Sequence, residues 1–162
     1  MSELNDFEQK ILATIEEHGC QILRIFDPEG EELDFSYSIG FEATLGQPEV
    51  LISGLPPDTA KDLINDTFVL CHDEGFDLVD FARTDRLIKG LECVVRSVRA
   101  DCLVPDYFGS AIWYAETQLN RPFSRAVQLV WPDRAGLFPW DQGFDEDFRD
   151  EQDELWARET VH

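Results

Sequence analysis

Leu33-Asp-Phe-Ser-Tyr-Ser-Ile-Gly40 is the segment whose residue pattern indicates a fold most clearly. Its apolar residues (Leu33, Phe35, Tyr37, Ile39) alternate with polar ones, and this period of two is typical of a β-strand with one buried face. A second strand is predicted at Glu49-Val-Leu-Ile-Ser53, whose apolar centre indicates burial on both faces. We therefore expect a β-sheet at the centre of the molecule.

The remaining periodicities predict helices and strands on both sides of this segment. Helices are expected at about 5–18, 57–74 and 105–119, and strands at 20–26, 91–98 and 125–131, whereas 77–82 is either a strand or an irregular link. Asn5 followed by Glu8 forms a capping-box pattern, and the stripe of the first helix begins with Phe7. These elements predict one α+β domain: a mixed or antiparallel sheet of about five strands, covered by about three helices.

The composition limits the classes of function. The chain has 162 residues, of which 43% are hydrophobic, enough for the core of one domain. With 34 acidic and 13 basic residues its formal charge is −21. This charge argues against binding of nucleic acid phosphates and of anionic membranes. The N-terminus lacks a signal-peptide core and no apolar run spans a bilayer, so a cytoplasmic location is expected.

The C-terminal part differs in composition from the rest. Residues 141–162 contain nine acidic side chains against Arg149 and Arg158. We divide the chain into an α+β domain at residues 1–144 and an acidic tail at residues 145–162. Such a tail either lies on the domain or is mobile.

Two tryptophans and two prolines gather in Trp131-Pro-Asp-Arg-Ala-Gly-Leu-Phe-Pro-Trp140. Prolines fix the backbone and aromatic rings supply rigid contact area. The block is either a lid that closes one end of the core, with Asp133 capping its turn, or a surface for a ligand or partner.

Glycines end the two central strands, and a carboxylate begins the second one. Gly40 marks a turn or a close approach of the backbone. Glu49 is either satisfied by backbone amides or poised for chemistry. If a ligand pocket forms beneath the tryptophan block, Glu49 or Asp133 would act as its acid or base. The candidate pocket residues are Tyr37, Gly40, Glu49, Trp131 and Asp133.

The strand with Phe35-Ser-Tyr-Ser-Ile-Gly-Phe41, the stretch Gln47-Pro-Glu-Val-Leu-Ile-Ser-Gly-Leu55 and the block Gln128–Asp141 resemble a known family. They are similar to the bacterial domain-of-unknown-function family 4262, over about residues 7–144. Members often carry His where this chain has Gln47, and often end in a Gln-Pro-hydrophobic stretch that is missing here. The resemblance implies a fold and no activity.

Signals for metal or catalytic chemistry are weak. His18, Cys20, Cys71 and His72 are residue types that suit zinc, but their separations fit no standard finger. No GxSxG, HExxH, P-loop or GxGxxG motif occurs, so we assign no catalytic residue, no metal and no cofactor. A basic island at residues 83–99 pairs with the acidic tail or holds an anionic ligand.

These observations favour a protein-binding module, of the inhibitor or immunity type, whose partner has a basic surface. Exposed aromatic side chains inside an acidic rim would anchor that partner. The alternatives are a small-ligand-binding protein or enzyme and a helper domain of a larger assembly. The candidate partner-binding residues are Trp140, Asp141, Phe144, Asp145, Asp147, Phe148 and Trp156.

Overall fold

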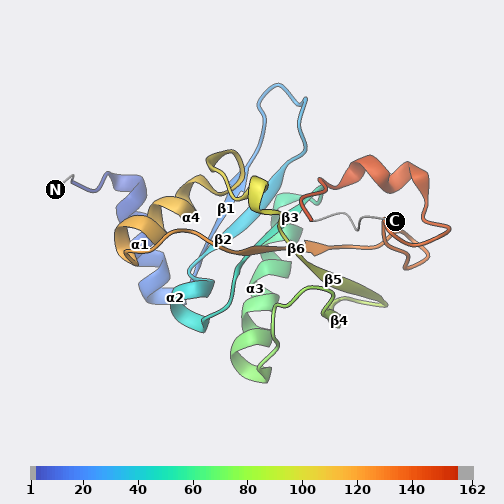
Figure 1. Cartoon of the computed structure of the whole chain (residues 1–162), viewed down its shortest axis with the longest axis horizontal. Helices are drawn as coiled ribbons and strands as arrows, with labels where there is room; N and C mark the ends of the chain where they lie inside the picture. Colours follow the sequence, from blue (N-terminus) through green and yellow to red (C-terminus); the bar gives the residue numbers. More distant parts are fainter. Residues whose placement is uncertain (1–2, 157–162) are drawn as a thin grey trace.

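Six β-strands form a single mixed sheet at the centre of the computed structural model, which describes residues 3–156 (Figure 1). The strand order is β1-β2-β3-β6-β5-β4; β3 and β6 run parallel, and every other neighbouring pair is antiparallel. The strands are β1 (Gln21–Ile25), β2 (Phe35–Ile39), β3 (Glu49–Ser53), β4 (Arg83–Ile88), β5 (Leu91–Ser97) and β6 (Ala126–Val130).

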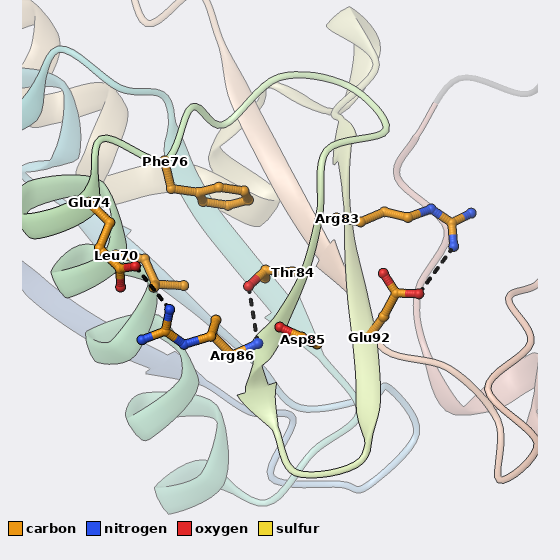
Figure 2. Close-up of a pocket in the computed structure, with 8 residues that line it drawn as sticks. All are labelled: Leu70, Glu74, Phe76, Arg83, Thr84, Asp85, Arg86 and Glu92. Atoms are coloured by element: carbon orange, nitrogen blue, oxygen red, sulfur yellow. Dashed lines mark hydrogen bonds and ion pairs between the residues drawn. The ribbon is translucent and has the colours of Figure 1, made fainter.

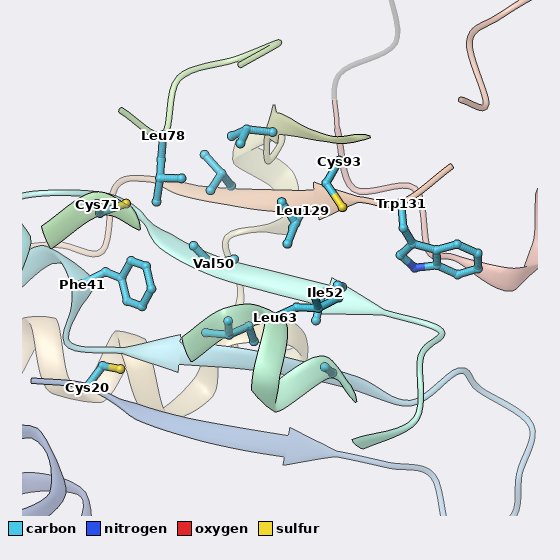
Figure 3. Close-up of a cluster of buried hydrophobic side chains, with 14 residues drawn as sticks. Cys20, Phe41, Val50, Ile52, Leu63, Cys71, Leu78, Cys93, Leu129 and Trp131 are labelled. Carbon is cyan, nitrogen blue, oxygen red and sulfur yellow. The ribbon is translucent and has the colours of Figure 1, made fainter. Parts of the chain in front are cut away.

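Helix α3 (Pro57–Glu74) covers one face of the sheet. Its apolar stripe packs against alternate residues of the central strands, so that Leu63 and Ile64 share one buried cluster with Val50 and Ile52. Leu63, Val50 and Ile52 are labelled in Figure 3. Pro57 occupies the first turn, where its missing N–H is not needed. Gly75, in the left-handed conformation, ends the helix as predicted.

The opposite face is covered by α1 (Asp6–His18), α4 (Pro105–Gln118) and residues 155–156. Tyr37, Ile39 and Leu51 point to this side and pack against Ile11 and Phe108. Trp156 covers the β5–β6 part, where it packs on Val94 and Val130. The two short helical turns at Ala100–Cys102 (η1) and Glu146–Glu151 (η2) lie in the connections.

The predicted α+β class is confirmed. The capping box is present: the Asn5 side chain accepts from the Glu8 N–H, and the Glu8 side chain accepts from the Asn5 N–H. Phe7, predicted as core, is 54% exposed because the helix turns Ile11 and not its first turn towards the sheet. Of the described strands and α-helices, two were not predicted: the edge strand β4 and the five-residue helix α2 (Phe41–Leu45).

Candidate functional site

The tryptophan block lies where β6 leaves the sheet. Trp131 is buried, and its indole N–H donates to the Ser53 carbonyl oxygen at 2.9 Å, joining the end of β6 to the end of its parallel neighbour β3. The block continues through a turn to Phe138 and Trp140, whose rings stack with centroids 5.3 Å apart.

Asp133 organises the loop that follows. Its side chain is 2% exposed, and its Oδ1 accepts the N–H groups of Ala135 and Leu137 at 2.9 Å. Its Oδ2 accepts the Asp145 N–H, also at 2.9 Å, and so ties the acidic part of the chain to the block. Desolvation raises the pKa of Asp133, but these backbone donors outweigh it and the net shift is downward. An ionised carboxylate therefore fixes the loop.

Neutral side chains hold the end of the chain on the sheet. Gln128, fully buried in β6, donates to the Asp153 carbonyl at 2.6 Å and accepts the Leu155 N–H at 3.1 Å. Gln152 makes the reciprocal pair with Trp131, accepting its backbone N–H at 3.2 Å and donating to its carbonyl at 2.7 Å. The C-terminal segment, residues 141–156, thus lies on the domain; residues 157–162 of the predicted tail are outside the described part.

Carboxylates project from the outer side of this segment. Five acidic side chains are exposed here, and we call them the acidic ridge: Asp145, Glu146, Asp147, Asp150 and Glu151. Asp145 caps η2 by accepting the Asp147 N–H at 3.0 Å. Asp141, a predicted partner-binding residue, is half-buried and accepts the Phe138 N–H at 2.9 Å.

The predicted aromatic anchors are less exposed than expected. Phe144 is 6% and Trp156 4% exposed, so the expectation that both lie on the surface is wrong. They are buried because the segment covers the apolar end of the sheet, as Trp156 does over Val94 and Val130. Trp140 and Phe148 are half-buried, and Phe148 lies in the segment that carries the acidic ridge.

Arg96 is enclosed by aromatic rings next to Trp140. Its guanidinium lies 4.0 Å from the ring centroid of Phe81 and 4.7 Å from that of Trp140, and it donates to Asp80 at 2.9 Å. Phe81 has φ +69°, a conformation that costs a bulky residue free energy, and its N–H bonds the Val95 carbonyl at 2.7 Å. The sequence offered no signal for this cluster, because its members come from three separate segments.

Glu49, at the start of β3, is buried and fully hydrogen-bonded. One carboxylate oxygen accepts the Ser38 hydroxyl at 2.8 Å and the Phe41 N–H at 3.0 Å. The other accepts the N–H groups of Gly40 and Glu42 at 3.0 and 3.3 Å. Burial raises the pKa of Glu49 to about 7, although all four donors lower it. Of the two roles considered for Glu49, its partners favour the structural one: it holds the turn that begins α2.

The five predicted pocket residues do not meet in one cavity. Glu49 and Ser53 are the two ends of β3, about 13 Å apart in an extended strand, and Trp131 lies at the Ser53 end. The cavity beside Glu49 has a volume of about 60 Å³, room for a few water molecules but far less than an organic ligand needs. Tyr37 is buried elsewhere and accepts the Ser110 N–H at 3.0 Å.

Gly40 has a structural reason for being glycine. Its φ is +121°, and a Cβ there would lie 2.6 Å from the Gly19 carbonyl oxygen. The residue therefore permits the close approach of the chain before β1 to the end of β2.

A larger pocket lies between the end of α3 and the β4–β5 hairpin (Figure 2). Its volume is about 430 Å³, and Phe76 and Thr84 line its interior. The Arg86 guanidinium donates to Glu74 at 2.9 Å and that of Arg83 lies 4.0 Å from Glu92 (Figure 2). The two arginines of the basic island that line this pocket are thus paired with acidic residues of the same pocket, and we assign it no ligand.

Arg99, at the end of the basic island, contacts both a nearby acidic residue and the C-terminal segment. Arg99 pairs with Asp101 at 3.2 Å and also donates to the carbonyls of Glu154 and Trp156 at 3.1 and 3.4 Å. Its contact with the C-terminal segment is therefore made to backbone oxygens and not to the acidic side chains.

All four cysteines are buried free thiols, and burial raises the pKa of Cys20 and Cys93 to about 12. Within residues 3–156, no three His, Cys, Asp or Glu side chains gather as they would around a metal ion. His18 projects into solvent while Cys20 and Cys71 face the core. Among the helices of this range, none combines the length and apolarity needed to cross a bilayer.

Comparison with known proteins agrees with the sequence motifs. No curated protein and no solved structure gave a match. The model of one family, described as a domain of unknown function, DUF4262, matches residues 14–145, which include the sheet, the tryptophan block and the start of the C-terminal segment. The chain therefore belongs to the DUF4262 family.

Proposed function

We propose that this protein is a protein-binding module that captures a partner with a basic surface through the acidic ridge. The observation that carries the proposal is the way the ridge is held. Gln128 and Gln152 fix the backbone of residues 152–155, directly after the ridge, and Asp133 fixes its first residue, Asp145. A surface fixed in advance loses little conformational entropy when a partner binds.

The charge of the ridge supports this function. Five carboxylates project within seven residues, and the one basic side chain between them, Arg149, pairs with Glu146 at 2.7 Å. Such a concentration of one sign of charge speeds the encounter with an oppositely charged protein and adds specificity.

The neighbouring rings supply apolar contact area. Phe148, within the ridge segment, and Trp140 are both partly exposed, whereas Phe144 and Trp156 are buried. Phe148 packs against Trp131 and Trp140 against Trp156. A partly apolar centre with charged groups around it is the usual anatomy of a protein interface.

The more specific form of the proposal is an inhibitor or immunity protein of the bacterial cytoplasm. A small acidic domain of this kind neutralises a toxin or enzyme by covering its basic surface. The acidic ridge would occupy the positions that the phosphates or other anionic groups of the target's substrate take.

Two charge-matched variants test the proposal. The ridge variant carries D145N, E146Q, D147N, D150N and E151Q. The matched variant carries E16Q, E17Q, E29Q, E31Q and E32Q, five exposed acids of α1 and the β1–β2 connection. Both change the net charge equally. The wild type and both variants, without tags at their termini, are each cross-linked to their partners in a lysate of the protein's own host. The captured partners are quantified by mass spectrometry. The affinity of the enriched partner is then measured at two salt concentrations.

We expect a basic partner that the wild type and the matched variant bind equally, and that the ridge variant binds at least about tenfold more weakly. The affinity of the wild type for this partner falls as the salt concentration rises, because exposed charges are screened. Equal retention by both variants, or an affinity independent of salt, would contradict the proposal.

A further inference from the structure

A wide groove opens around the beginning of β1, away from the acidic ridge. Helix α1 and helix α3 lie on opposite faces of the sheet, and both border its β1 edge (Figure 1). The groove between them has a volume of about 750 Å³, within the range of small-molecule sites.

One polar face of each helix lines this groove. Lys10, Thr14 and His18 follow each other at intervals of four along α1, and therefore share a face. Lys61 and Asn65 show the same interval on α3. Two helices from opposite sides of the sheet thus turn cationic and hydrogen-bonding side chains towards one space.

The charge of the groove is opposite to that of the molecule. The chain carries −21 and three lysines, yet two of those lysines line the groove and no carboxylate does. In residues 3–156, no carboxylate lies within 4.0 Å of either ammonium group, whereas eight arginines make such pairs. The nearby His18 ring lies 3.8 Å from Glu17, so the uncompensated positive charge belongs to Lys10 and Lys61.

The floor of the groove is apolar. Ile22 and Phe68 are half-buried there, and Val69 is 50% exposed. A groove lined by two unpaired ammonium groups and an exposed apolar residue presents both an electrostatic and a hydrophobic contact to the same molecule.

We propose that this groove binds a small organic anion, with its charged head between Lys10 and Lys61 and its apolar body on Phe68 and Val69. The two unpaired ammonium groups select the sign of the head, and the exposed floor selects an apolar body. This site is independent of the acidic ridge, and either proposal stands without the other.

The small number of lysines makes a direct test feasible. Reductive methylation with ¹³C-formaldehyde labels Lys10, Lys61 and Lys89 and keeps their charge, so each lysine reports through its own NMR signal. The probe is octanoate, compared with acetate, which lacks the body, and octylammonium, which has the opposite charge. The variants K10Q, K61Q and K89Q assign the three signals, and calorimetry on unlabelled protein gives the affinities.

We expect octanoate to shift the signals of Lys10 and Lys61 and to leave that of Lys89, in the β4–β5 turn, in place. K10Q and K61Q each weaken octanoate binding about tenfold, K89Q does not, and acetate and octylammonium bind far more weakly than octanoate. Lys10 and Lys61 are exposed, so unchanged melting temperatures will show that the variants are folded. Equal shifts at all three lysines, equal binding of octylammonium, or unchanged affinity in K10Q and K61Q would overturn the proposal.

Discussion

The two ends of the parallel pair β3 and β6 both bury polar groups, but they do so with different chemistry. At one end the Glu49 carboxylate gathers the backbone N–H groups of residues 40–42. At the other end Gln128, Gln152 and the Ser53 hydroxyl, all neutral, hold residues 152–155. Because a buried carboxylate titrates and an amide does not, the contacts of Glu49 couple the fold to pH, whereas those of Gln128 and Gln152 do not, and we call the second end the neutral end. The neutral end holds residues 152–155 without a titrating group, whereas Asp145 of the acidic ridge is held by the Asp133 carboxylate.

The largest effect is expected from forcing the neutral end apart. Gly54 has φ +83°, and a Cβ there would overlap the backbone carbonyl of Glu151. G54A should therefore displace the C-terminal segment and lower the free energy of unfolding by about 3 kcal/mol.

Gly46 provides the matched control, because it has φ +67° and open space around its Cβ position. G46A should cost about 1 kcal/mol, the conformational part alone. Urea unfolding of both variants measures the difference, and equal losses would show that the contact with residue 151 contributes nothing.

The second largest effect is expected from E49Q, which tests whether stability depends on pH through the Glu49 end. The pKa of Glu49 is about 7 in the folded chain against an ordinary value of 4.5. The folded state therefore binds this proton more tightly, and the resulting stability is complete below pH 4.5 and is lost as the pH rises through about 7. E49Q should remove this pH dependence, and it should also cost about 2 kcal/mol, because its NH₂ group faces N–H donors.

The measurement is the free energy of unfolding between pH 4.5 and 7.5 for the wild type, E49Q and the control E42Q. Glu42 is a surface partner of Arg125, at 2.9 Å, so its loss should leave the pH dependence unchanged. If the free energy of unfolding of E49Q depends on pH as that of the wild type does, the dependence arises from other groups.

The smallest effect concerns the rings that hold the neutral end from outside. Phe81 keeps φ +69° while its ring contacts Arg96 and Trp140. F81A loses the ring and keeps the strain, whereas F81G loses both. F81G should therefore be more stable than F81A by about 1 kcal/mol in thermal or urea unfolding. The reverse order would mean that the backbone at this position is not strained.

The local pattern of apolar and polar residues was sufficient to predict most of the strands and helices. The alternation in residues 33–40 and the apolar stripe of residues 57–74 predicted elements that match within a few residues, because burial of one face imposes a period on the sequence. β4 was missed because Arg83-Thr-Asp-Arg-Leu-Ile88 lies at the sheet edge and its residues are largely solvent-facing. The five-residue α2 is held by Glu49, a contact that no local pattern contains.

The candidate site was predictable only in part, and for the same reason. The sequence located the acidic stretch and the tryptophan block, since charge and aromatic content are properties of the residues themselves. It could not show that Gln128 meets Asp153, that Trp131 meets Ser53 or that Lys10 and Lys61 share a groove. These pairs are separated by 25 to 78 residues. Periodicity reports which face of an element is buried, whereas a hydrogen bond between distant residues forms only when the packed sheet has brought both partners together.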